Sequence, residues 1–113
     1  MAKDTLNILW TNADPVTSEL MVLMYAKASA MRGWWKRVRV IVWGATAKLV
    51  AENETIRDLV REAQREGVEF SACEACADRL GVKKALQDLD VEVILWGYPL
   101  TELLRDEETL ITV

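Results

Sequence analysis

The chain has 113 residues, the size of one domain, and its 51% apolar and 28% charged residues are typical of a globular protein, not of a disordered or fibrous one. Two linked domains would not fit in this length. The formal net charge is -4 and the largest basic cluster, Arg32 to Arg39, is short, which argues against nucleic acid as a partner.

The first half of the chain predicts a strand, a long helix and a second strand. The run LNILWT, residues 6–11, is typical of a strand that is buried on both faces. Asp14 before Pro15 predicts the start of a helix of about 17 residues that ends at Gly33. The run VRVIVWG, residues 38–44, then repeats the pattern of the first strand, an apolar run closed by tryptophan.

The second half continues this alternation. A helix is expected from near Asn53 to Gly67, because apolar residues recur there at helical spacing and the other face is charged. The remaining predicted elements are a short strand at 68–72, helical stretches at 74–80 and 83–89, a strand at 91–97 (VEVILWG), a helix from Pro99 and a last strand at 109–113.

Alternating strands and helices predict a three-layer α/β/α architecture. We expect one domain over residues 1–113, with a mostly parallel sheet of five strands and helices on both faces. No linker or low-complexity tract interrupts the chain. In such sheets ligands bind at the carboxyl ends of the strands, and Cys73 follows the third of them.

The stretch VEFSACEACADRLG contains both cysteines, Cys73 and Cys76. The N-terminus has no signal-peptide core and no stretch approaches the roughly 20 apolar residues of a membrane span, so we expect a cytoplasmic protein without a membrane partner. In that reducing compartment a permanent disulfide is disfavoured. A cysteine at the start of a helix is favoured as a thiolate, although a small buried residue is the common alternative.

Other chemistries lack their residues. The chain has no histidine, which excludes a Cys–His nucleophile pair and every histidine-containing metal site within one chain. A tetrahedral zinc site would need a second cysteine pair, from a dimer. The first strand is followed by TNADPVTSE and not by a glycine cluster, so no nucleotide cofactor is expected.

Aromatic and polar residues near the strand ends are candidate pocket residues. Trp10, Trp43 and Trp96 each stand at the carboxyl end of a predicted strand, either as core residues or as walls of a dry pocket. Asn12 and Tyr98 come from the loops after the first and fourth strands and are further candidates, although such residues are usually turn formers.

Self-association is a separate expectation. Trp34 and Trp35 are adjacent, so one ring is expected to be buried and the other to lie at a surface or interface. Met21, Met24 and Met31 on the preceding helix fit the same interpretation, although methionines are more often core residues.

The sequence resembles the DsrE/DsrF-like (YchN-like) family of small sulfur carriers. Four blocks support the resemblance in order: ILWTNADPVTSELMVLMYAKASAMRGW, VRVIVWGATAKLV, IRDLVREAQREGVEFSACEACADRLG and VEVILWGYPLTELL. The resemblance implies an α/β/α domain, a homotrimer or homohexamer, and a cysteine after the third strand that holds a persulfide. Cys73 occupies that position, whereas Cys76 lies outside the minimal pattern and is interpreted as a resolving or second carrier thiol.

These observations lead to one main hypothesis and two alternatives. Sulfur exchange needs a thiolate and a shielded site, but no metal, nucleotide or histidine base. We therefore expect a sulfur carrier or sulfurtransferase-like protein that uses Cys73 and exchanges sulfur with donor and acceptor proteins or small sulfane compounds. The alternatives are a dithiol redox protein that uses both cysteines and an interaction module with inert thiols.

Overall fold

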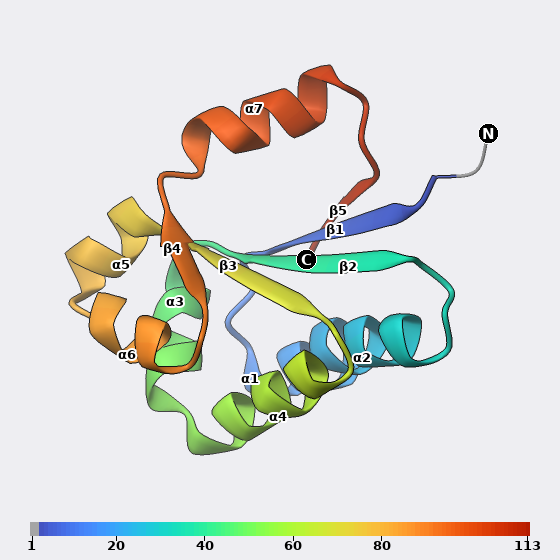
Figure 1. The fold of residues 1–113 in the computed structure, drawn as a ribbon. Helices are drawn as coiled ribbons and strands as arrows, with labels where there is room; N and C mark the ends of the chain where they lie inside the picture. Colours follow the sequence, from blue (N-terminus) through green and yellow to red (C-terminus); the bar gives the residue numbers. More distant parts are fainter. Residues whose placement is uncertain (1–2) are drawn as a thin grey trace.

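The computed structural model describes residues 3–113 and contains a five-stranded sheet (Figure 1). All strand pairs are parallel, and the strand order is β4-β3-β2-β1-β5. The predicted α/β architecture is confirmed, and the sheet is parallel throughout. The strands are β1 (Thr5–Trp10), β2 (Arg37–Val42), β3 (Glu69–Cys73), β4 (Glu92–Ile94) and β5 (Leu110–Thr112).

Helices cover the two faces of this sheet unequally. The first face carries α1 (Pro15–Thr17), η1 (Ser18–Leu23), α2 (Met24–Met31), α3 (Ala45–Glu52), α4 (Glu54–Arg65), α5 (Glu74–Leu80) and α6 (Lys83–Asp88). Among the helices of residues 3–113, α7 (Gly97–Arg105) alone lies on the second face (Figure 1). The strand order explains this, because three successive right-handed crossovers move in one direction from β1 to β4, whereas the last reverses across the sheet to β5.

Alternating side chains on each strand divide the interior into two parts. On β1, Leu6, Ile8 and Trp10 face the main core under the larger helical layer, while Asn7 and Leu9 face the side of α7. The other strands follow the same alternation. A smaller cluster on the α7 side has Ile41, Cys73 and Trp96 at its centre, with partly buried Leu9, Trp43, Cys76, Ile94, Leu100, Leu103 and Leu110 around it.

The predicted helix starts are confirmed at two caps. The carboxylate of Asp14 accepts the Thr17 N–H at 2.9 Å, and the side chain of Asn53 accepts the Ile56 N–H at 3.0 Å. The hydrogen bond with Thr17 lowers the pKa of Asp14. The first long helix contains the π-helical segment η1, which residue spacing alone does not reveal.

Two elements differ from the prediction. No helix was predicted at 45–52, where α3 forms after Gly44. The fourth strand ends at Ile94 and not at Gly97. Helix α7 begins at Gly97, two residues before Pro99, where its start was predicted. Within residues 3–113, none of the helices is sufficiently long and apolar to cross a membrane.

Candidate functional site

The two cysteines lie where β3 passes into α5. Cys73 is the last residue of β3 and the N-cap of α5, with extended backbone (φ -70, ψ 118), and its side chain makes no capping hydrogen bond. Cys76 lies one turn further along the helix. Both are free thiols; Cys73 is 5% exposed and Cys76 is half-buried. Cys76 is therefore the more accessible sulfur.

A backbone N–H points at the second sulfur. The Gly44 N–H donates to Cys76 Sγ at 3.3 Å, from the turn between β2 and α3. Gly44 has φ +72, a conformation that residues with a side chain rarely adopt, which explains the glycine at this position. Because β2 and β3 are neighbours, the turn after β2 reaches the helix after β3.

Burial and neighbouring groups shift the pKa of Cys76. Burial raises the pKa of the Cys76 thiol above its ordinary value, against the Gly44 hydrogen bond, which lowers it. The hydrogen bond with Cys73 and the charge of that sulfur raise this pKa further, whereas Arg79 lowers it. The Cys76 thiol is therefore harder to ionise than an ordinary thiol.

Two of the predicted tryptophans lie beside the cysteines. Trp96 is 2% exposed and belongs to the same apolar cluster as Cys73, and its Nε1–H donates to Ser71 Oγ at 2.7 Å. Trp43 is half-buried and packs against this cluster. The structure thus brings together Cys73, Cys76, Trp43 and Trp96.

The other three pocket candidates lie elsewhere, and their assignment is corrected. Trp10 faces the main core on the opposite side of the sheet, where its Nε1–H donates to Ser18 Oγ at 3.1 Å, because alternate strand residues point to opposite faces. Asn12 is an exposed turn residue whose Oδ1 accepts the Asp14 N–H at 2.9 Å. Tyr98 is 66% exposed and lines a surface hollow formed by α7 and Asp106, the residue that follows it.

A single helix covers the apolar cluster that contains the cysteines. Leu100 and Leu103 of α7 pack over the apolar cluster, but no residue of α7 is fully buried. Leu104 on the outer side is 59% exposed. The cover over Cys73 is therefore one loosely packed helix, unlike the thick helical layer on the other face.

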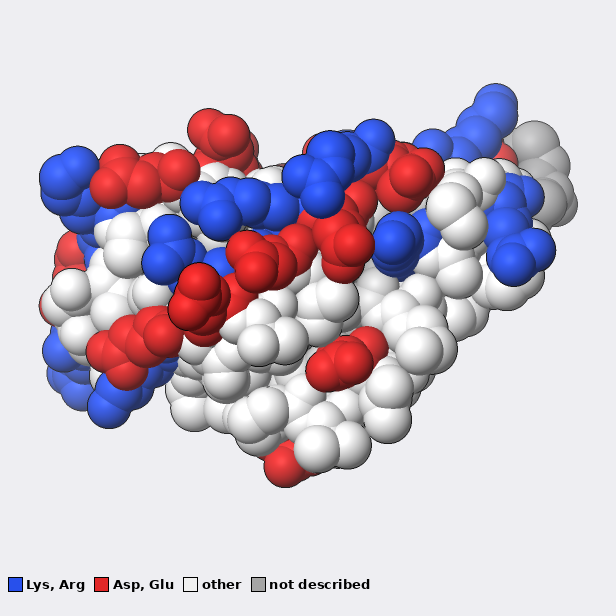
Figure 2. Space-filling view, turned by 90° about the horizontal axis from the view of Figure 1, so that it is seen from below, with Lys and Arg blue, Asp and Glu red and all other residues white. Residues whose placement is uncertain are grey.

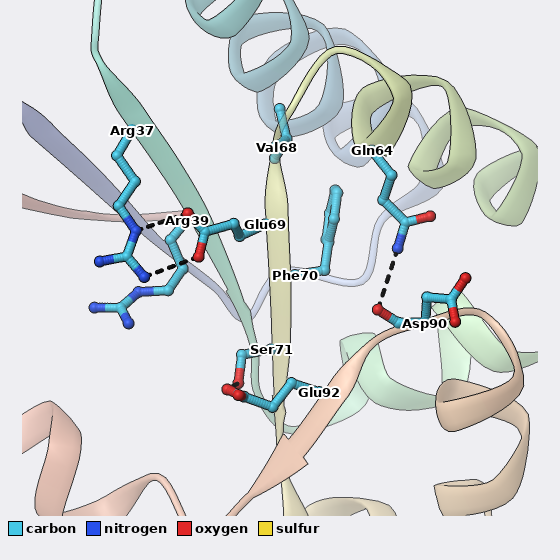
Figure 3. Close-up of a pocket in the computed structure, with 9 residues that line it drawn as sticks. All are labelled: Arg37, Arg39, Gln64, Val68, Glu69, Phe70, Ser71, Asp90 and Glu92. Carbon is cyan, nitrogen blue, oxygen red and sulfur yellow. Dashed lines mark hydrogen bonds and ion pairs between the residues drawn. The ribbon is translucent and has the colours of Figure 1, made fainter.

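The amino-terminal half of the same sheet face is polar. Arg37 binds Glu69 through two hydrogen bonds, from Nε to Oε2 at 2.7 Å and from Nη2 to Oε1 at 2.8 Å. The Ser71 hydroxyl donates to Glu92 Oε1 at 2.8 Å. Figure 3 shows this region, a hollow of about 440 Å³ lined by Arg37, Arg39, Gln64, Val68, Glu69, Phe70, Ser71, Asp90 and Glu92.

Arg39 connects the polar half of this sheet face to the apolar cluster that contains the cysteines. Its Nε donates to Asn7 Oδ1 at 3.0 Å, and its guanidinium carbon lies 5.1 Å from the centroid of the Trp96 ring. Arg39 was not among the site residues predicted from the sequence. The alternation in RVRVIV could have placed Arg37 and Arg39 together on one face of β2.

Comparison with known proteins places the chain in a family. The sequence model of the DsrE/DsrF-like family matches residues 8–113. The chain belongs to the DsrE/DsrF-like family. Both cysteines, the covering helix and the polar half of the sheet face lie within the matched residues. No match was found among curated proteins.

Two solved structures resemble this DsrE/DsrF-like chain. A conserved protein of unknown function from Bacteroides thetaiotaomicron, BT1422, is 37% identical with a TM-score of 0.95, over 97% of this chain and 95% of that one. The ychN protein from E. coli is 15% identical with a TM-score of 0.70, over 99% of this chain and 100% of that one, and shows the same fold.

In residues 3–113, no three cysteine, aspartate or glutamate side chains gather as a metal site.

Proposed function

We propose that this protein is a sulfur carrier that accepts a sulfane sulfur at its cysteine pair, holds it as a persulfide on Cys73 and passes it to a partner protein. Membership of the DsrE/DsrF-like family supports a role in sulfur relay. The observation that carries the proposal is the position of the pair: Cys73 caps α5 beneath a single covering helix, with Cys76 as the more exposed neighbour.

Each step exchanges one sulfur–sulfur bond for another. The Cys73 thiolate attacks the outer sulfur of a donor persulfide, the donor leaves as a thiolate, and Cys73 becomes Cys73–S–SH. The apolar walls around Cys73 keep water and oxidants from this sulfur. Cys76 then takes the outer sulfur, and the Gly44 N–H stabilises its anion, before a partner cysteine removes it. No step changes the overall oxidation state, so no reductant is required.

Intact-mass measurement tests the proposal. After incubation with inorganic polysulfide, we expect the chain to gain the mass of one sulfur atom, and peptide mapping places the adduct on the cysteine pair. Cys73→Ser is expected to abolish stable loading, whereas Cys76→Ser still loads but transfers more slowly to an acceptor thiol. Loading that survives in Cys73→Ser and disappears in Cys76→Ser would reverse the two roles, and the absence of any adduct would refute the proposal.

The dithiol alternative rests on the position of Cys76 one helical turn after Cys73, with both residues in the same apolar cluster. If Cys76 attacks the inner sulfur of Cys73–S–SH, the products are a Cys73–Cys76 disulfide and hydrogen sulfide, and a thiol must then reduce the disulfide. This outcome is recognised by a loss of two hydrogens in the intact mass, together with released sulfide.

A further inference from the structure

Arg39 is held in place while its terminal nitrogens stay free. Its Nε donates to Asn7, and its guanidinium lies over the ring of Trp96. Asn7 is 1% exposed and donates its own Nδ2 to the Thr109 carbonyl at 3.1 Å, so a buried side chain is committed to fixing this arginine. Within residues 3–113, no carboxylate pairs with Arg39, and its two Nη groups make no hydrogen bond.

The neighbouring cation is already neutralised. Arg37 lies beside Arg39 on β2, and two of its nitrogens donate to the two carboxylate oxygens of Glu69 (Figure 3). Burial lowers the pKa of Arg39, and repulsion from Arg37 lowers it further. Arginine nevertheless stays charged in proteins, so Arg39 is a partly desolvated cation without a counterion.

The acidic side chains near the hollow do not act as the counterion of Arg39. Glu92 is turned to the Ser71 hydroxyl, and Asp90 lies on the other side of β3 from Arg39 (Figure 3). Glu69, Glu92 and Glu108 attract the charge of Arg39 only from beyond ion-pair distance. A planar guanidinium with a free edge matches the two oxygens of a carboxylate or similar oxyanion.

We propose that the free edge of Arg39 binds the oxyanion, a carboxylate or a sulfonate, of a small ligand in the hollow. Asn7 and Trp96 hold the guanidinium ready, so little side-chain order is lost on binding. The volume of about 440 Å³ is in the range of small-molecule sites. Trp96 contacts Arg39, which lines the hollow, and packs in the apolar cluster of Cys73, so it connects the two regions.

The ligand class follows if the cysteines accept sulfur, and this part rests on the proposed function. The ligand is then a small donor R–S–SH whose R group ends in the oxyanion. The Cys73 thiolate attacks the outer sulfur, the donor sulfur–sulfur bond breaks, R–S⁻ leaves, and a new sulfur–sulfur bond forms at Cys73. The transfer is balanced without an oxidant or a reductant.

Binding is tested first without any sulfur chemistry. Acetate and methanesulfonate are titrated at constant ionic strength set with chloride, and tryptophan fluorescence or NMR shifts report on Trp96. We expect saturable binding that weakens at least about tenfold in Arg39→Gln and less in Arg39→Lys, which keeps the charge but not the fork. Arg105→Gln, on exposed α7, is the matched control and should bind as the parent does. No saturable binding, or equal affinity in Arg39→Gln, would overturn the proposal.

Two donors that differ only in their end group test the ligand class. The persulfide of mercaptopropionate carries a carboxylate, and that of mercaptoethanol carries a neutral hydroxyl. We expect the carboxylate donor to load the parent protein faster and this preference to fall at least about tenfold in Arg39→Gln. Equal loading of the parent by both donors would overturn the ligand class and leave the proposed function standing. Failure of both donors and of inorganic polysulfide would refute the proposed function, while the acetate titration would still decide the binding site.

Discussion

At the scale of single residues, the chemistry of the second sulfur depends on one backbone conformation. Gly44 adopts a positive φ that directs its N–H to Cys76, and the thiol itself is half-buried. Burial and the neighbouring sulfur favour the protonated form of Cys76, whereas this single N–H favours the anion. The balance between the two forms is therefore set by a residue that is remote in sequence.

Substitution of Gly44 by alanine tests this dependence. We expect Gly44→Ala to destabilise the fold by roughly 1–3 kcal/mol through backbone strain and to raise the pKa of Cys76 further, because the N–H moves away from the sulfur. The pH dependence of alkylation in a Cys73→Ser background measures that pKa. Gly67→Ala is the matched control, since Gly67 also has a positive φ (+97) but lies at the end of α4. An equal shift in both variants would contradict this role for the Gly44 N–H.

The raised pKa of Cys76 also predicts a dependence of stability on pH. A thiol whose pKa is higher in the folded state stabilises the fold below its unfolded pKa, and this contribution is lost as the pH rises through the folded pKa. The free energy of unfolding should therefore fall above pH 9.0, the ordinary thiol value, and fall less steeply in Cys76→Ala. Urea denaturation between neutral and alkaline pH measures both slopes. Identical slopes would show that Cys76 is not the group responsible.

At the scale of elements, we expect α7 to control the reactivity of Cys73. It touches the sheet through Leu100 and Leu103 and carries no fully buried residue, which is typical of segments that open locally at low cost. Cys73 is covered by this helix and by Trp96. We therefore expect its reactivity to depend on how often α7 opens away from the sheet.

Shortening a contact of α7 should expose Cys73. We expect Leu103→Ala to weaken the cover by about 1–2 kcal/mol, because a partly buried leucine contributes less than a core leucine. The alkylation rate of Cys73 in a Cys76→Ser background should then rise by roughly 5–30-fold. Leu104→Ala on the exposed side is the control. If both variants react at the parent rate, the helix is not the barrier.

The elements also show what the sequence could predict. Caps and apolar runs located β1, β2, β3 and the long helices, because these signals are local. The helix α3 was missed because its eight residues follow a strand run that already ends in glycine and offer no side-chain cap. The sequence could not separate the face of Trp10 from that of Trp96, because two-sided burial removes the alternation that would distinguish them. The Arg39 site depends on contacts between strands, which no local pattern contains.

At the scale of the whole molecule, an exposed apolar surface follows one segment. Most of the large exposed apolar side chains come from residues 16–34, namely Val16, Leu20, Met21, Met24, Met31 and Trp34, between 39% and 64% exposed. Figure 2 shows the helical side of the molecule, where a broad area without basic side chains lies beside a band of mixed charge. Exposed patches of this kind usually mark interaction surfaces.

We propose that this surface joins copies of the chain, as the expected trimer or hexamer requires. Leu20→Glu places a charge on the surface and should lower the mass measured by sedimentation equilibrium toward that of the monomer, 12.8 kDa. Leu104→Glu, which adds the same charge to exposed α7, should leave the mass unchanged. If Leu20→Glu keeps the parent mass, another face holds the copies together.

The pairing of β5 with β1 has a consequence for newly made chains. Strand β1 pairs with β5 around Ile8 and Ile111, so this edge of the sheet forms only after β5 has been synthesised. The Val113 carbonyl also accepts the Thr11 N–H at 2.7 Å. Helix α7, which covers Cys73, is anchored at its end by β5. During synthesis, both cysteines are therefore translated well before the elements that cover them. A thiol-reactive probe on ribosome-bound chains should therefore reach both cysteines until the residues of β5 have left the ribosome.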